Sequence, residues 1–115
     1  MLFSTTLARR IALPALASMA FLTGSAVFGQ AGGEVTFKQQ CAMCHGADGS
    51  GNTGMGKTLK LRDLRSPDVQ KMSDAELAAL IAKGKGRMPA YESKLGNERI
   101  QAVVAYLREL AKTRK

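Results

Sequence analysis

The stretch CAMCH, residues 41–45, holds both cysteines and the only histidine of this 115-residue sequence. A thioredoxin-like redox dithiol would place such a pair at the start of a helix that follows a strand, and no strand–helix–strand pattern surrounds it. A structural zinc site needs four ligands. This sequence offers three, and two of them, Cys44 and His45, are adjacent. Neither reading accounts well for the motif.

The same spacing, Cys-x-x-Cys-His, is the signature of covalent haem attachment. Two thiols three residues apart on one helical turn can each add to a vinyl group at one edge of a porphyrin. The following histidine is then carried beneath the iron and can bind it. We therefore predict thioether bonds from Cys41 and Cys44 and an axial iron ligand from His45.

The first 29 residues differ from the rest of the chain. Arg9 and Arg10 precede an apolar run, 11–22, and small residues follow it, with no acidic residue anywhere in the segment. This order is typical of a secretory signal peptide, here with cleavage after Gly29 or Ala31. An uncleaved N-terminal membrane anchor is the alternative, because the apolar stretch approaches the length of a spanning helix. Either way, we expect residues 30–115 to form one exported domain.

Positive charge exceeds negative charge along the whole chain. The net charge is +8, and removal of residues 1–29 leaves +6. Such a domain attracts acidic partners, which include acidic protein surfaces, nucleic acid and anionic lipid. The basic residues are scattered, apart from the C-terminal KTRK, so a solvated surface is the simplest explanation and we predict no nucleic-acid binding.

Helical signals recur through residues 34–115. An amphipathic pattern over 34–44 predicts a short first helix, and the glycine-rich stretch 46–56 predicts a loop. Ser66 followed by Pro67 marks a helix start. Ser73 and Glu76 form a capping box, with Met72 and Leu77 as its hydrophobic staple. We expect the apolar face of that helix to consist of Leu77, Leu80 and Ile81, and its end to lie at Gly84.

The last part of the chain contains its most regular pattern. Glycines at 84, 86 and 96 and a proline at 89 predict an irregular segment. From Asn97 onward, apolar residues recur at helical spacing to the basic tail. No repeat and no strand pattern is visible, so the sequence predicts an all-α fold with three to four short helices.

Taken together, these features make the sequence similar to the small class I monohaem cytochromes c. The resemblance covers nearly all of residues 30–115 and rests on CAMCHG, the glycine-rich loop, GRMPAY and the last helix, AVVAYLREL. It implies a cytochrome c fold whose loops wrap one covalently bound haem c. It also implies that Gly33 and Phe37 of the first helix pack against Tyr106 of the last.

The iron needs a sixth ligand or an open position, and no second histidine exists. Among the methionines after residue 29, Met43 lies on the attached side, Met72 is explained as the staple, and Met55 lies in the loop expected on the histidine side. Met88 lies 43 residues beyond His45 in an irregular segment, and Met-Pro followed by an aromatic resembles the axial-methionine loop of the family. We predict Met88 as the sixth ligand, with a core methionine as the alternative.

One feature departs from the family pattern. A proline commonly follows the haem motif there, and a backbone carbonyl near it orients the axial histidine. This chain has Gly54 and Met55 in that region, so the carbonyl that orients His45 is left open.

The resemblance implies a periplasmic one-electron carrier with His/Met ligation, not an enzyme, and the positive charge indicates the kind of partner. We expect a monomer that docks on acidic surfaces of redox proteins, for example a membrane oxidase or reductase. The candidate docking rim consists of Lys57, Lys60, Lys83, Lys85 and Arg87. Two alternatives are a haem c sensor or small-ligand-binding module with a displaceable methionine, and a minimal peroxidase, which would need an open iron position.

Overall fold

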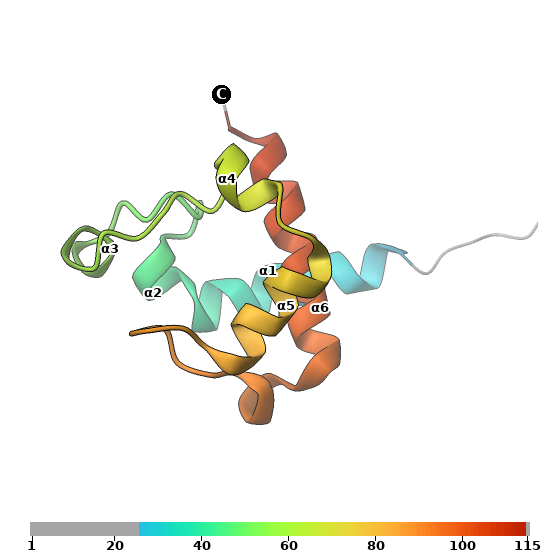
Figure 1. Cartoon of the computed structure of the whole chain (residues 1–115). Coiled ribbons are helices and arrows are strands. Elements are labelled where there is room, and N and C mark those ends of the chain that lie inside the picture. Colours follow the sequence, from blue (N-terminus) through green and yellow to red (C-terminus); the bar gives the residue numbers. More distant parts are fainter. Residues whose placement is uncertain (1–25, 115) are drawn as a thin grey trace, which may run out of the picture.

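The computed structural model describes the backbone of residues 26–114 and the side chains of residues 32–114. Its helices, shown in Figure 1, are α1 (Ala26–Gln40), α2 (Ala42–His45), α3 (Gly54–Thr58), α4 (Pro67–Gln70), α5 (Asp74–Lys83) and α6 (Glu92–Lys112). Within this part of the chain there is no strand, only an isolated bridge between Lys85 and Met88. The all-α prediction is confirmed. The expected number of helices was too low, because α2, α3 and α4 are single turns of four or five residues.

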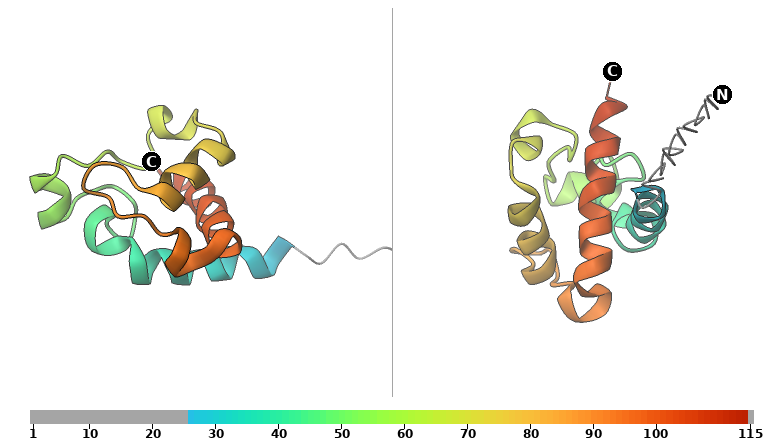
Figure 2. Two further views of the ribbon diagram at one scale, coloured as in Figure 1. Left: turned by 60° about the horizontal axis from the view of Figure 1, so that its bottom comes forward. Right: turned by 90° about the vertical axis from the view of Figure 1, so that its right-hand side faces the viewer.

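The long C-terminal helix organises the fold. In Figure 2, α6 lies between α1 on one side and α4 with α5 on the other. The crossing with α1 is close because residue 33 is glycine. A Cβ at Gly33 would lie 2.0 Å from the carbonyl oxygen of Ala102. One turn further along α1, the rings of Phe37 and Tyr106 meet at a centroid distance of 5.5 Å and an interplanar angle of 56°. The packing expected for Gly33, Phe37 and Tyr106 is confirmed.

A single hydrophobic core lies between these helices. Its most deeply buried side chains are Phe37, Ile100, Val103 and Val104, each at most 2 % exposed. The remaining members come from α4, α5 and α6, namely Val69, Leu77, Ala78, Ile81, Leu107 and Leu110. The periodicity of α6 is thus explained by burial, since its apolar residues recur on one helical face.

Helix α5 begins as the sequence predicts. Ser73 accepts a hydrogen bond from the Glu76 amide at 3.1 Å, and the Glu76 carboxylate accepts one from the Ser73 amide at 2.7 Å. Met72 packs against the core cluster that contains Leu77, and Gly84 ends the helix with a φ of 73°. The expected apolar face was partly wrong. Leu80 is only half-buried, and Ala78 occupies the core in its place.

Several boundaries differ from the prediction. Helix α1 starts before residue 34 and stops at Gln40, and the chain resumes helical geometry in α2 after Cys41. The loop predicted over 46–56 contains the start of α3. Helix α6 begins at Glu92 rather than Asn97, although Gly96, with φ 71°, breaks its geometry just before the predicted start. These differences arise because short helical turns rest on caps and close contacts more than on apolar periodicity.

Candidate haem-binding site

The CAMCH motif folds as a tight helical turn at the end of α1. The Cys41 amide donates to the Phe37 carbonyl at 2.8 Å, so the last turn of α1 leads directly into the motif. The Cys41 carbonyl then accepts from the amides of Cys44 at 3.2 Å and His45 at 3.0 Å. This arrangement places both cysteines on one turn, as attachment to one edge of a ligand would require.

The two cysteines form no disulfide, and both are half-buried. Burial, followed by the proximity of Cys44, raises the pKa of the Cys41 thiol to about 11. The Cys41 side chain also packs against the hydrophobic core. The described residues contain no group of three or more His, Cys, Asp or Glu that could hold a metal ion.

The His45 imidazole is half-buried directly after the second cysteine. Burial lowers its pKa below the usual value, which favours the neutral ring that can bind iron. Its Nδ1 atom is buried and makes no hydrogen bond with the described residues. The carbonyl that orients this ring, which the sequence left open, is therefore not identified among the observed contacts.

The loop after the motif is held against it by Thr53. The Thr53 hydroxyl donates to the Cys44 carbonyl at 2.7 Å and accepts from the Gly56 amide at 2.8 Å, which caps α3. Gly56 packs closely here, since a Cβ on it would lie 2.0 Å from the Gly51 carbonyl oxygen. The Gly51 amide in turn donates to the His45 carbonyl at 2.7 Å. Sequence reasoning missed Thr53, although a threonine three residues before Gly56 is a recognisable N-cap signal.

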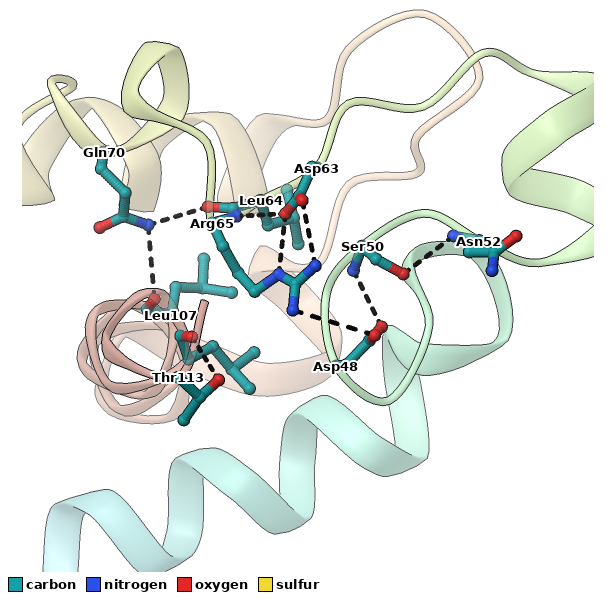
Figure 3. A network of polar contacts seen from close by, with 10 residues as sticks. Asp48, Ser50, Asn52, Asp63, Leu64, Arg65, Gln70, Leu107 and Thr113 are labelled. Carbon is teal, nitrogen blue, oxygen red and sulfur yellow. Dashed lines mark hydrogen bonds and ion pairs between the residues drawn. The ribbon is translucent and has the colours of Figure 1, made fainter. Parts of the chain in front are cut away.

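A second polar network holds the far side of this loop, as Figure 3 shows. Arg65 forms an ion pair with Asp63 at 3.0 Å and a longer one with Asp48 at 4.0 Å. The Asp48 carboxylate also accepts from the Ser50 amide at 3.0 Å. These contacts join residues 48–52 to residues 63–65, so the glycine-rich loop has a defined course.

The segment before α4 is tied to the C-terminal helix. Gln70 donates to the carbonyls of Leu64 at 2.8 Å and Leu107 at 3.4 Å. Arg108 donates to the carbonyls of Gln70 at 3.0 Å and Met72 at 2.6 Å. Apart from the bond to Leu64, the partners are more than thirty residues apart in sequence, so no local pattern could have indicated these contacts.

Met88 lies in the segment 84–91, which we call the strap. The strap connects α5 to α6 and lies on the same side of α6 as α2 and α3 in Figures 1 and 2. Lys85 and Met88 exchange two backbone hydrogen bonds, at 3.1 and 2.9 Å. The Met88 side chain is half-buried and, like Cys41, packs against the core. The structure thus brings the strap and the CAMCH turn to one side of the same core.

The candidate rim residues are all exposed. They lie in α3 and just after it (Lys57, Lys60), at the end of α5 (Lys83) and in the strap (Lys85, Arg87). None of the five forms an ion pair with another residue that the structure describes. Two large apolar side chains, Met43 and Met55, are also exposed on the α2–α3 side, at 81 % and 46 %.

Comparison with known proteins defines the class of this fold and site. Residues 29–107 match the family model described as cytochrome c oxidase, cbb3-type, subunit III. The chain therefore belongs to this family of haem c electron-transfer proteins, within the small class I monohaem c-type cytochromes, and it carries one covalently bound haem c.

Particular relatives and one solved structure agree with this assignment. The chain is 38% identical over 81 residues to cytochrome c6 of Leptolyngbya boryana, covering 70% of this chain and 91% of the relative. It is 33% identical over 111 residues to cytochrome c6 of Picosynechococcus, covering 91% and 94%. The solved structure of the KustC0563 c-type cytochrome superposes with a TM-score of 0.63 at 31% identity, covering 68% of this chain and 95% of that one.

The described residues fit a covalently bound haem. Two cysteines that form no disulfide stand on one helical turn, and a neutral, half-buried imidazole follows them. The strap presents a thioether side chain on the same side of the core. Thiols, imidazole and thioether are the donor set that c-type haem uses.

Proposed function

We propose that this protein is an exported one-electron carrier whose haem c is attached through Cys41 and Cys44 and ligated by His45 and Met88. The observation that carries the proposal is the CAMCH turn, because it combines two cysteines that form no disulfide with the only histidine of the sequence, held neutral by burial. The family match over residues 29–107 supports it.

The haem, when bound, supplies a one-electron ferric/ferrous couple. The protein contributes the attachment, the axial ligands and the exclusion of water. Burial keeps the His45 ring neutral and able to bind iron. Met88 is proposed as the sixth ligand because the strap that carries it lies on the same side of the core as the CAMCH turn, with the Met88 side chain half-buried. A thioether ligand stabilises ferrous iron and so raises the reduction potential, which suits transfer toward an oxidase.

Docking is proposed to occur on acidic surfaces of redox proteins. The five cations of the candidate rim form no ion pair with a described residue and flank the two segments that carry the proposed ligands; they are Lys57, Lys60, Lys83, Lys85 and Arg87. Positive charge of this kind steers association and makes it sensitive to salt. The family description names a cbb3-type oxidase, and the relatives are cytochromes c6. We therefore propose a membrane oxidase or reductase as partner, contacted by a monomer.

Export to the periplasm remains a proposal from the sequence. The predicted signal peptide, residues 1–29, lies mostly outside the described residues, as does most of the alternative membrane anchor, residues 11–28. Within residues 26–114, no helix combines the length and the apolar character needed to cross a membrane. The intact mass of the native protein would decide cleavage and haem attachment together.

Potentiometric titration of the purified haem protein tests the carrier function. We expect a reversible wave that fits a single one-electron step, and no change in the ferrous spectrum under carbon monoxide, because Met88 occupies the sixth position. Rapid binding of carbon monoxide would instead support the sensor, and rapid oxidation of a dye by hydrogen peroxide would support the peroxidase. Either result would contradict the carrier assignment.

A further inference from the structure

We propose that Tyr91 is a positioning residue for the sixth ligand, because its hydroxyl fastens the strap to the helix that leads into the cysteine motif. The proposal rests on the proposed function, in which Met88 binds the iron. It concerns how firmly that ligand is held. The role belongs to the hydroxyl group of Tyr91, whereas the resemblance to the family rests only on an aromatic residue at this position of GRMPAY.

Tyr91 joins the ends of three helices. Its hydroxyl donates to the carbonyl of Gln40, the last residue of α1, at 3.2 Å. Its amide donates to the carbonyl of Ile81 in α5 at 3.1 Å, and its own carbonyl accepts from the amide of Leu95 in α6 at 2.8 Å. The ring is half-buried and packs against the core. The backbone bonds fix where the strap ends, and the hydroxyl bond fixes how that end sits against α1.

The bond to Gln40 spans the two sides of the proposed haem site. Gln40 directly precedes Cys41, and only Pro89 and Ala90 separate Met88 from Tyr91. The hydroxyl therefore connects the segment that would carry the sixth ligand to the segment that would carry the first thioether.

The other end of the strap is already fixed by steric contact. Gly84 has a φ of 73°, and a Cβ there would lie 2.5 Å from the Met88 carbonyl oxygen. Backbone bonds between Lys85 and Met88 close the turn in between. Because these backbone contacts hold residues 84–88 together, loss of the Tyr91 hydroxyl would loosen the attachment of the strap, and of Met88 with it, to α1. That loosening would raise the fraction of molecules in which Met88 has left the iron.

The test uses imidazole as a probe of that fraction in the ferric haem protein. Imidazole binds the iron only when the sixth position is free, so its apparent affinity rises with the population of the detached state. Removal of one neutral hydrogen bond shifts such an equilibrium roughly three- to tenfold. We therefore expect Tyr91→Phe to bind imidazole roughly three- to tenfold more tightly than the wild type, with the far-red sulfur-to-iron band still present but lost at lower imidazole.

Tyr106→Phe is the matched control. It removes the same atom from the other tyrosine, whose ring packs on Phe37 at the α1–α6 crossing and whose hydroxyl makes no hydrogen bond with a described residue. It should bind imidazole as the wild type does, within twofold. A general loss of stability would lower the unfolding midpoint of a variant, but it would not raise the imidazole affinity of Tyr91→Phe alone.

Each outcome decides one of the two claims. Equal imidazole affinities in Tyr91→Phe and the wild type would overturn the role of Tyr91 while leaving His/Met ligation intact. An equal increase in Tyr106→Phe would also overturn it. A wild-type ferric protein without the far-red band would contradict Met88 ligation itself, and with it the role assigned to Tyr91.

Discussion

Thr53 uses one hydroxyl for two contacts that hold the haem motif in place. It donates to the carbonyl of Cys44 and accepts from the amide of Gly56, so it supports the end of α2 and the start of α3 together. A buried carbonyl or amide that loses its partner costs more than the net value of the bond itself. We therefore expect Thr53 to contribute more to the free energy of unfolding than an ordinary residue of a glycine-rich loop.

We predict that Thr53→Val lowers the free energy of unfolding by about 1–2 kcal/mol, from the loss of an N-cap and a hydrogen bond to a motif carbonyl. Urea denaturation of the haem-loaded protein measures this. Thr58→Val is the control, because the Thr58 hydroxyl is exposed and donates only to Gly54 in its own helical turn. If Thr58→Val loses as much stability as Thr53→Val, the bond to the Cys44 carbonyl does not explain the loss in Thr53→Val.

At the scale of the element, the start of α5 depends on charge as well as geometry. The Ser73 amide donates to the Glu76 carboxylate, and this bond lowers the pKa of Glu76 from its ordinary value of 4.5. A carboxyl whose pKa is lower in the folded state contributes stability above its unfolded pKa. That contribution is lost as the pH falls through the folded pKa.

We therefore predict that Glu76→Gln is less stable than the wild type at neutral pH, and that the difference shrinks as the pH falls below 4.5 and disappears once the pH is below the lowered pKa of the folded state. Unfolding midpoints measured as a function of pH give the comparison. Glu98→Gln, which removes one negative charge from an exposed residue of α6, serves as the control. A difference between Glu76→Gln and the wild type that persists unchanged in acid would exclude the charged capping box as its cause.

The elements were predictable where their signals are local. The capping box of α5, the proline start of α4 and the apolar face of α6 could all be read from neighbouring residues. The start of α3 was missed although its N-cap is also local, since the Thr53 hydroxyl accepts from the Gly56 amide; only the bond from Thr53 to the Cys44 carbonyl needed the folded structure. Leu80 was misassigned to the core since helical spacing alone could not separate it from Ala78.

For the whole molecule, the crossing of α1 and α6 sets the position of everything else. Gly33 permits it, since any side chain there would meet the backbone of Ala102. The adjacent Gly32 has no atom within 4 Å of an added Cβ. A glycine-to-alanine substitution can therefore be compared at a crowded position, Gly33, and at an open one, Gly32.

We predict that Gly33→Ala costs at least about 2 kcal/mol of stability, because the helices must separate to admit the methyl group. Gly32→Ala should be neutral or stabilising by up to about 1 kcal/mol, since alanine favours a helix. Thermal or urea unfolding of the two variants provides the test. Equal stabilities would mean that the close approach at Gly33 does not govern the packing.

The site was predictable from sequence to the extent that its residues form motifs. For the proposed site, CAMCH pointed to the two cysteines and the histidine, and the family resemblance pointed to Met88 in GRMPAY. The supports of the site were not visible, because Gln70 with Arg108 and Tyr91 with Gln40 join residues far apart in the chain. Long-range hydrogen bonds leave no periodic signal, so only the folded structure reveals them.

The ferric absorption spectrum of Met88→Ala, recorded beside that of the wild type, tests the central claim most directly. The account predicts a weak far-red sulfur-to-iron band in the wild type at neutral pH and in a Met55→Ala control, and its absence in Met88→Ala with the haem still covalently attached. A wild-type protein without the band, or a Met88→Ala protein that keeps it, would contradict ligation by Met88 and the electron-carrier site built on it.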